Sequence, residues 1–350
     1  MDGVDASIIQ SDGENKYKVI IDKYFEYPPN IYKDLTKLRD KIKISKDLKK
    51  FSKEIKSIEK EITIFHAKAV NQILKKAKIN VDLVGFHGQT IYHNAKEKIS
   101  RQIGDAKLLS KLTKKNIVYN FRQNDLKNGG EGAPLTPIFH QMLEKKFDIK
   151  PVSFINIGGI LNRTTIWNDG ELSAKDEGPG MCLIDKWIRT NSKQKYDENG
   201  DIAKSGKLNK IILDKYLDSF KTSSLYQKSY DTNDFNISLA KGLSLEDGAA
   251  TLTYYTANIL IIFFLSKEQL KIKEKIILCG GGRKNKFLID IIKNYNKEIK
   301  LIDDYGLNGD FIESQAFAYL SIRSYLKLPI SFPKTTGVRK ACTGGIVIKV

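Results

Sequence analysis

The chain has 350 residues, of which 41% are hydrophobic and 29% are charged, and its formal net charge is +18. This length and apolar content suffice to bury a sizeable core and to form two domains, so we expect a soluble α/β protein. The longest strongly apolar run, residues 257–265, is much shorter than the roughly 20 residues of a membrane-spanning helix, so no membrane partner is expected.

The strongly basic charge raises the question of nucleic-acid binding. Lysines are spread along the whole chain and alternate with acidic residues, as in residues 37–61, without an arginine-rich arm or an interleaved aromatic platform. We interpret most of them as solvated helix faces and expect no nucleic-acid partner. Attraction of an anionic substrate by the excess positive charge stays open.

The cysteines and the N-terminal residues indicate the compartment. Cys182, Cys279 and Cys342 are widely spaced and form no metal-binding or disulfide pattern. Residues 1–10 lack the basic start and apolar stretch of a secretory signal. We therefore expect reduced thiols and a cytoplasmic location.

The first half of the chain predicts a hairpin, a long helical region and two strands that end in polar loops. Strands are expected at residues 6–10 and 17–22 around the turn Asp12-Gly13, with Asp2-Gly3-Val4-Asp5 just before them. Apolar residues at steps of three and four predict helix between residues 33 and 79. The elements that follow are a strand at 81–86 running into His87-Gly88-Gln89-Thr90, a strand at 116–121 followed by Arg122, Asp125 and the loop 129–134, and a helix at 137–147.

A domain boundary is expected between residues 145 and 150, which gives domains at 1–148 and 149–350. The second domain begins with a strand at 152–157, and the turn residues 168–170 predict a hairpin after it. The further predicted elements are helices at 180–189, 208–219, 245–265, 284–295 and 310–326, and strands at 275–278, 300–303 and 345–350.

The motif Asp176-Glu-Gly-Pro-Gly180 is predicted to form a turn that opens directly into a helix. Its glycines would let the backbone approach a ligand closely, and Pro179 suits the first helical turn. In an alternative interpretation, Asp176 or Glu177 only caps that helix. Other glycine-rich turns follow strands elsewhere in the chain, and such turns often bind nucleotides and sugars in α/β proteins, which favours a ligand site.

Two glycine turns are candidates for contact with a nucleotide. Gly158-Gly159 and Gly280-Gly281-Gly282 each follow an apolar strand, so their backbone N–H groups could point at phosphate or ribose. Neither fits the P-loop or the dinucleotide-binding fingerprint. A single turn of this kind is explained equally well as an ordinary connection in a parallel sheet.

Glu313 is a candidate functional carboxylate. Ala316, Phe317 and Leu320 follow it at helical spacing, so its side chain is predicted to point inward with them. A buried charge usually has a partner or a ligand, and an ordinary ion pair is the alternative. His87 is a weaker candidate because a lone histidine at a strand end is often only a structural hydrogen bonder.

Read together, the motifs resemble the anhydro-N-acetylmuramic acid kinases, members of the sugar kinase, Hsp70 and actin superfamily. No single short motif decides this, but the ordered set covers nearly the whole chain and is highly specific. In chain order the motifs are Asp2-Gly-Val-Asp5, Gly85-Phe-His-Gly-Gln-Thr90, Gln102-Ile-Gly-Asp105, Asn120-Phe-Arg-Gln-Asn-Asp125, Gly129-Gly-Glu-Gly-Ala-Pro-Leu135, Asn156-Ile-Gly-Gly159, Asp176-Glu-Gly-Pro-Gly180, Cys279-Gly-Gly-Gly282 and Glu313-Ser-Gln-Ala-Phe-Ala318.

The resemblance implies two ribonuclease-H-like α/β domains, of the actin-type ATPase kind, around a central cleft that holds ATP. It implies ATP and Mg²⁺ as cofactors and a small amino sugar as the other partner, and it leaves a homodimer open. Asn156, Gly158 and Gly159 would form a phosphate loop, and Gly280, Gly281 and Gly282 would lie against the adenosine. Asp2, Gly3 and Asp5 would belong to the ATP site, with Asp2 also near Mg²⁺.

The family opens 1,6-anhydro-N-acetylmuramic acid with water and phosphorylates the oxygen on carbon six, giving N-acetylmuramic acid 6-phosphate during cell-wall recycling. Asp176 matches the family's catalytic aspartate and would act as general base on the water. Glu313 would help to place the water and the sugar. The residues expected on the sugar side are His87, Gln89, Arg122, Asp125 and Glu131.

Two departures from the family pattern are notable. Members usually carry a first strand and a Gly-Thr-Ser turn before the position of Met1, so we expect the natural start to lie upstream and the chain to be N-terminally truncated. Glu177 replaces the threonine that the family prefers, and its charge beside the proposed base is expected to raise the pKa of that base.

Two other functions stay open. The chain could be a truncated, non-catalytic relic or regulator that still binds the sugar. It could also be a kinase of another carbohydrate, because a fold alone does not fix the substrate.

Overall fold

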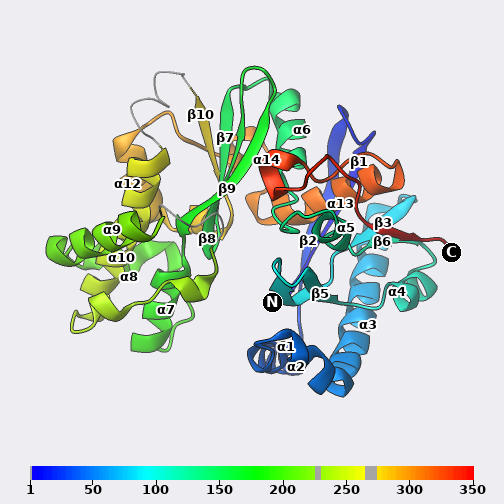
Figure 1. Ribbon diagram of the computed structural model, residues 1–350, viewed down its shortest axis with the longest axis horizontal. Helices are drawn as coiled ribbons and strands as arrows, with labels where there is room; N and C mark the ends of the chain where they lie inside the picture. The colour runs from blue at the N-terminus through cyan, green and yellow to red at the C-terminus, as the bar shows by residue number, and fades with distance from the viewer. Residues whose placement is uncertain (1, 225–229, 265–273) are drawn as a thin grey trace. The chain divides into compact units, whose positions relative to one another are not determined.

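The computed structural model describes residues 2–224, 230–264 and 274–350, and their contacts divide the chain into two compact units (Figure 1). The first unit is made of Met1–Lys146 and Phe311–Val350, and the second of Phe147–Asp310. Within the described ranges, no helix combines the length and the apolar character needed to cross a bilayer.

The first unit contains two antiparallel hairpins and a three-stranded sheet. The hairpins are β1 (Gly3–Ser11) with β2 (Tyr17–Glu26), and β4 (Gln89–Asn94) with β5 (Ile99–Ile103). In the sheet, β3 (Leu83–Phe86) lies parallel to β6 (Asn116–Tyr119), and β6 pairs antiparallel with β12 (Ile346–Ile348). The helices are α1 (Pro29–Lys41), α2 (Ser45–Lys50), α3 (Ser52–Ala77), α4 (Ala106–Thr113), α5 (Gln123–Lys127), α6 (Pro137–Phe147), α13 (Ile312–Tyr325) and α14 (Pro333–Thr336).

Helix α3 forms because its apolar residues recur at steps of three and four, which gives one buried stripe. Ile55, Ile58, Ile62 and Ile73 on this stripe are buried. Helix α13 packs against both β1 and β3. Because β3 and β6 are parallel neighbours, the polar residues that follow each strand come together at one edge of the sheet.

The second unit contains a five-stranded mixed sheet in the order β11-β10-β7-β8-β9. Strands β7 (Val152–Ile157), β8 (Ile160–Ile166) and β9 (Leu172–Pro179) form an antiparallel meander, and β10 (Lys275–Cys279) and β11 (Lys300–Leu301) extend it in parallel. The α-helices with described bounds are α7 (Cys182–Asn191), α8 (Asp201–Ser205), α9 (Lys210–Ser224), α10 (Leu245–Ile259) and α12 (Lys286–Tyr295).

The core of the second unit lies between one face of this sheet and the helices. Ile155, Ile157 and Leu161 from the sheet pack with buried apolar side chains of α7, α9, α10 and α12. These helices lie on the same side of the sheet (Figure 1). The short, mainly apolar strands β7 and β10 have neighbours on both sides in the sheet, as expected for strands covered by helices.

Most of the elements predicted from the sequence are present. The hairpin at residues 6–22, the strand at 152–157, the helix at 137–147 and the hairpin around 168–170 are confirmed. The predicted helical region from 33 to 79 consists of three helices, and the β4–β5 hairpin was not predicted. Residue 265, the predicted end of a helix, lies outside the described residues.

Three predicted boundaries are wrong for local reasons. Gly3–Asp5 belongs to β1 and does not precede it, because the chain pairs with β2 from Gly3 onward. Gly178 and Pro179 belong to β9, and the helix after them starts at Cys182. The strand predicted at 300–303 ends at Leu301, because Asp304 accepts a hydrogen bond from the Leu301 amide at 2.9 Å and closes a 3-10 turn.

The expected second domain, residues 149–350, differs from the observed unit at its C-terminal end. Residues 311–350 belong to the first unit, because α13 packs against β1 and β3 and β12 pairs with β6. The sequence could not show this, since a chain that returns to the first unit looks no different from one that stays in the second.

Candidate active site

Asp176 lies in β9, directly beside a β-bulge in the pairing of β9 with β8. Asn162 is its cross-strand partner, and the register shifts so that Glu177 has no residue opposite it. The Asn162 side-chain amide donates to Asp176 Oδ1, and the Tyr230 backbone N–H donates to Oδ2 at 3.0 Å. Bulges often re-aim a side chain next to a functional site. The two donors fix the orientation of the carboxylate.

The alternative interpretation, in which Asp176 or Glu177 only caps the following helix, is wrong, since the residue before α7 is Met181 and no side chain caps it. Glu177 is buried and forms an ion pair with Arg163 at 3.0 Å. Burial raises the pKa of Glu177, and the Arg163 charge opposes that increase. The negative charge of Glu177, which was expected to affect Asp176, is therefore compensated by the positive charge of Arg163.

The glycines around Pro179 hold the end of β9 against the β7–β8 turn. A Cβ on Gly180 would lie 2.3 Å from the carbonyl oxygen of Gly158, so only glycine fits. The Met181 N–H donates to the Gly158 carbonyl at 2.8 Å, and the Gly180 N–H donates to that of Gly159 at 3.0 Å. These contacts tie the strand of Asp176 to the predicted phosphate turn.

The two predicted nucleotide turns are neighbours in the second unit. Strands β7 and β10 are parallel and Cys279 pairs with Asn156, so the turns after both strands emerge at the same edge of the sheet. A Cβ on Gly280 would lie 2.1 Å from the side-chain oxygen of Asn156. The structure thus brings Asn156, Gly158-Gly159 and Gly280–Gly282 together, as a nucleotide site at a sheet edge requires.

Different structural constraints act on the individual glycines of these turns. A Cβ on Gly282 would lie 2.2 Å from Cγ2 of Ile157, and Gly280 has φ +82°, so both are explained by packing and backbone conformation. Around Gly281 nothing lies within 4 Å of an added Cβ, and around Gly158 the nearest atom is at 3.4 Å. Packing does not explain these two glycines, and close approach of a ligand would.

A groove of about 1100 Å³ lies within the first unit, between β1 and β3 and between α3 and α13. Six of the predicted site residues line it: Asp2, Gly3 and Asp5 from the ATP set, His87 and Gln89 from the sugar set, and the catalytic candidate Glu313. Glycine at position 3 has a packing explanation, because an added Cβ would lie 2.5 Å from the Phe25 carbonyl oxygen. Gln89 also contacts the Tyr27 hydroxyl, with Nε2 at 3.4 Å.

His87 and Arg122 bind each other at the ends of β3 and β6. Arg122 donates to His87 Nε2 from Nε at 3.2 Å and from Nη2 at 3.0 Å, while His87 Nδ1 donates to the Gly88 carbonyl at 3.0 Å. Burial, helped by the Arg122 charge, lowers the pKa of His87 to about 3. His87 is therefore neutral near pH 7 and acts as an acceptor for Arg122.

Asp125 organises the loop that carries Glu131. It is buried, and its Oδ1 accepts from the Gly132 N–H at 2.6 Å while its Oδ2 accepts from the Thr336 hydroxyl. Arg122 donates to the Gly132 carbonyl at 2.9 Å, and the Glu131 N–H donates to the Thr336 carbonyl at 2.8 Å. Both carboxylate oxygens of Asp125 are thus used inside the protein.

The prediction that Glu313 points into the protein interior is wrong. Ala316, Phe317 and Leu320 are buried, but Glu313 is exposed in the first turn of α13 and lines the groove. Side chains of an α-helix tilt toward its N-terminus, so a residue in the first turn projects beyond the packed stripe. Burial lowers the pKa of Arg122, and the Glu313 charge opposes that decrease, which places the two groups within electrostatic reach.

The residues described by the structure include no group of three or more His, Cys, Asp or Glu side chains placed to hold a metal ion. Mg²⁺ in nucleotide sites usually needs only one or two carboxylates besides the phosphates. Asp2, the carboxylate expected near Mg²⁺, is exposed just before β1.

Sequence reasoning missed several residues that hold the site. Asn162 and the Tyr230 backbone fix Asp176, Thr336 fixes the loop at 129–134, and Arg283 fixes the Gly280 turn. The partner of Asp176 could have been found from the alternation of β8 and β9, but the other contacts join segments that are distant in sequence.

Comparison with known proteins gives a consistent result along the whole chain. A family model described as Anhydro-N-acetylmuramic acid kinase matches residues 1–349. The relative of that name from Pelagibacter ubique is 53% identical over 100% of this chain and 96% of its own length. The relative of that name from Agrobacterium fabrum is 34% identical with the same coverage, and that from Zymomonas mobilis is 38% identical over 99% of this chain and 96% of its own length.

Proposed function

Because this chain belongs to the anhydro-N-acetylmuramic acid kinase family, we propose that its glycine turns hold ATP and that Asp176 activates a water against the sugar. The enzyme is a phosphotransferase that acts on 1,6-anhydro-N-acetylmuramic acid in peptidoglycan recycling. The observation that carries the residue assignment is the adjacency of the two glycine turns to the end of the strand that bears Asp176.

The proposed reaction consumes one water and one ATP. Asp176 takes a proton from the water as its oxygen bonds to the anomeric carbon and the bond from that carbon to the bridging oxygen breaks. The bridging oxygen then bonds to the γ-phosphorus, and ADP leaves. The products are N-acetylmuramic acid 6-phosphate, ADP and the proton taken by Asp176.

The residues of this chain have separate roles in this proposal. Asn162 and Tyr230 orient the Asp176 carboxylate. The N–H groups of Gly158 and Gly159 would bind the phosphates. Mg²⁺ would offset phosphate charge, with Asp2 as the proposed carboxylate near it. Glu313 positions water and sugar, and Gln89 and Glu131 are the proposed sugar contacts.

Two of the five residues predicted to contact sugar fit a different role. His87 and Asp125 spend their hydrogen-bonding atoms on Arg122, Gly132 and Thr336, so we propose that they position the sugar-side loop. Arg122 binds His87 and the Gly132 carbonyl. The Glu313 charge acts on the Arg122 guanidinium, which supports the proposal that Arg122 lies beside the sugar.

The proposal includes two ribonuclease-H-like domains. The second unit supports it, because an antiparallel three-stranded meander extended by two parallel strands is the arrangement expected of that fold. The first unit supports it less fully, with its β1–β2 hairpin and the parallel pair of β3 and β6.

The proposal is tested by assaying ADP release with ATP and a panel of sugars in water enriched in oxygen-18. We expect ADP only with 1,6-anhydro-N-acetylmuramic acid, and the label at carbon one of the product. ADP release with open sugars alone would identify a kinase of another carbohydrate. Sugar binding without any ADP release would identify a non-catalytic sugar-binding protein.

A further inference from the structure

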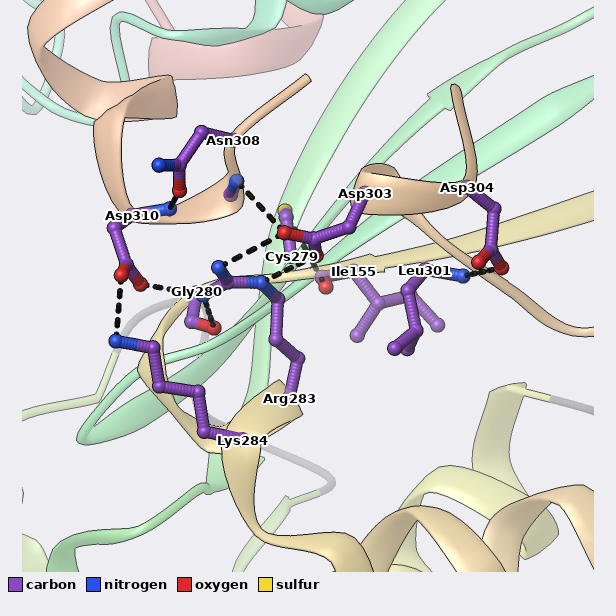
Figure 2. Close-up of polar contacts among 11 residues, drawn as sticks. Ile155, Cys279, Gly280, Arg283, Lys284, Leu301, Asp303, Asp304, Asn308 and Asp310 are labelled. Carbon is purple, nitrogen blue, oxygen red and sulfur yellow. Dashed lines mark hydrogen bonds and ion pairs between the residues drawn. The ribbon is translucent and has the colours of Figure 1, made fainter. Parts of the chain in front are cut away.

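Arg283 follows the Gly280–Gly282 turn and lies at the centre of a polar cluster. Its Nε and Nη2 donate to the two oxygens of Asp303 at 2.7 and 3.2 Å, and its Nη1 donates to Asp310 at 2.8 Å and to the Gly280 carbonyl at 3.0 Å. Figure 2 shows the guanidinium between the two carboxylates and the Gly280 carbonyl. We call Arg283, Asp303 and Asp310 the Arg283 cluster.

The surrounding backbone is shaped to receive this side chain. The guanidinium is buried, and Gly309 passes so close to it that an added Cβ would lie 2.2 Å from Nε. The Gly309 N–H also donates to Asp303 Oδ1 at 3.2 Å. A planar guanidinium that binds one carboxylate through two nitrogens and another through a third is held in a single orientation. The cluster therefore presents a fixed donor to the Gly280 carbonyl.

Fixing the Gly280 carbonyl also fixes the next N–H group. The carbonyl of Gly280 and the N–H of Gly281 belong to one planar trans peptide, so they point in opposite directions. Because the carbonyl accepts from Arg283, the Gly281 N–H points away from the guanidinium. Gly281 is exposed and has nothing within 4 Å of an added Cβ, so its surroundings have room for a ligand.

We propose that Arg283 is a positioning residue that orients the Gly280–Gly281 peptide for the nucleoside part of ATP. This inference rests on the proposed function of the Gly280–Gly282 turn. Without the guanidinium, the Gly280 carbonyl would keep only the longer hydrogen bond from the Arg283 backbone N–H, at 3.3 Å, and the peptide could rotate more freely, since glycine tolerates many conformations. The cluster would then act on nucleotide affinity through the backbone, without touching the reacting atoms.

Arg283→Met and Arg283→Lys are the test variants, with Lys284→Met as the matched control. Lys284 is exposed and pairs with Asp310 at 2.6 Å, whereas the side-chain donor to the Gly280 carbonyl is Arg283, so the control removes a neighbouring positive charge and keeps that donor. Asp303→Asn tests the cluster by a change of nearly constant shape. KM for ATP, KM for the sugar, kcat, and inhibition constants of ADP and adenosine are measured for each variant.

We expect Arg283→Met to raise the KM for ATP and the inhibition constants of ADP and adenosine by roughly tenfold. The loss of a hydrogen bond to a charged group typically changes an equilibrium constant by about tenfold or more. The KM for the sugar and kcat should change less than twofold. Arg283→Lys should restore part of the affinity, Asp303→Asn should give a smaller loss, and Lys284→Met should stay within twofold of the wild type.

A purely structural role would lower the melting temperature and the active fraction of Arg283→Met without changing its KM for ATP, and that result would overturn the inference. A loss confined to ATP and ADP, with adenosine inhibition unchanged, would also overturn it. If the wild-type protein itself neither bound ATP nor released ADP, the proposed function would fail, which is a distinct result.

Discussion

The predicted nucleotide side and the predicted sugar side are built by different means. In the second unit, Gly180, Gly280 and Gly282 bring strand ends into contacts that a Cβ would prevent, so the turns are shaped by backbone packing. In the first unit, Asp125, Arg122 and the Thr336 hydroxyl shape the loop at 129–134 through side-chain hydrogen bonds.

This difference separates residues that touch a ligand from residues that only hold the site. In the backbone-built region, a glycine with open space around it, such as Gly281, is the candidate for contact. In the side-chain-built region, a polar group whose atoms are all used, such as Asp125, is the candidate for support. A motif alone does not distinguish these two cases, because both kinds of residue occur within the same short stretches.

The largest expected effect is the loss of turnover on replacing Asp176. Asp176→Asn removes the proposed base, and the loss of a general base typically costs about 10²–10⁴-fold in rate. Both Asp176 oxygens accept from N–H donors, so the new amide would face one of them and distort the site. We expect kcat to fall by about 10³-fold while sugar binding, measured by calorimetry, is weakened less than tenfold.

The double variant Asn162→Asp with Asp176→Asn is the control for that distortion. It restores the cross-strand hydrogen bond with the donor and acceptor exchanged, and it moves the carboxylate to position 162. We expect it to fold well and to remain inactive. If the double variant recovered near wild-type turnover, the assignment of the base to position 176 would be untenable.

The next effect is on the stability of the sugar-side loop. Asp125→Ala leaves the Gly132 N–H without its acceptor and the Thr336 hydroxyl with only the Phe332 carbonyl at 3.5 Å, and an unsatisfied buried donor costs about 1–3 kcal/mol. Asp125→Asn should be much milder, because its oxygen can accept from Gly132 and the Thr336 hydroxyl can rotate to accept from its NH₂ group. Chemical denaturation of both variants measures this difference. Equal losses would contradict the proposed hydrogen-bond geometry.

A smaller effect distinguishes two adjacent glycines in the backbone-built region. Gly282→Ala forces a Cβ against Ile157 and should destabilise the protein by about 1–3 kcal/mol. Gly281→Ala has open space, so its unfolding free energy should change by less than about 1 kcal/mol while its affinity for ATP falls. Denaturation and nucleotide titration test the pair. If Gly281→Ala bound ATP as tightly as the wild type, Gly281 would not be a contact residue.

The sequence predicted the elements of the fold better than their assembly. Regular spacing predicted β7, α6 and the β1–β2 hairpin, because local periodicity determines each of them. Residues 311–350 return to the first unit through contacts with β1, β3 and β6, which no local pattern reveals. The start of α7 was misplaced because β9 continues through Gly178 and Pro179, residue types that are typical of turns.

The candidate site shows the same limit. Family motifs selected Asp176, Glu313 and the glycine turns as candidates, but they did not predict which side chains would be exposed. Glu313 was expected to be buried from its helical spacing, whereas the first helical turn leaves it exposed. Arg283 was missed as a supporting residue because the carboxylates that hold it, Asp303 and Asp310, lie 20 and 27 residues away, and Thr336 was missed because Asp125 lies 211 residues away.

The smallest expected effect is an opposite pH dependence of stability in the two units between about pH 4 and 6.5. All four histidines belong to the first unit, and burial lowers the pKa of His66 to about 4 and that of His87 to about 3. Between these values and the ordinary pKa near 6.5, the unfolded chain binds more protons, so stability of this unit rises with pH. Asp22, whose pKa burial raises, opposes this trend in part.

In the second unit, burial raises the pKa of Asp185 to about 6 and also raises the pKa values of Glu177 and Glu274. Here the folded state binds more protons above pH 4, so stability falls as pH rises through this window. Hydrogen exchange, corrected for intrinsic rates, measures the protection of each unit at pH 4.5 and 6.5. His66→Gln should flatten the slope of the first unit by at most about 1.4 kcal/mol per pH unit, whereas His93→Gln, at an exposed position, should change it less. Parallel slopes in the two units would show that buried histidines and buried acids do not dominate their stability in this range.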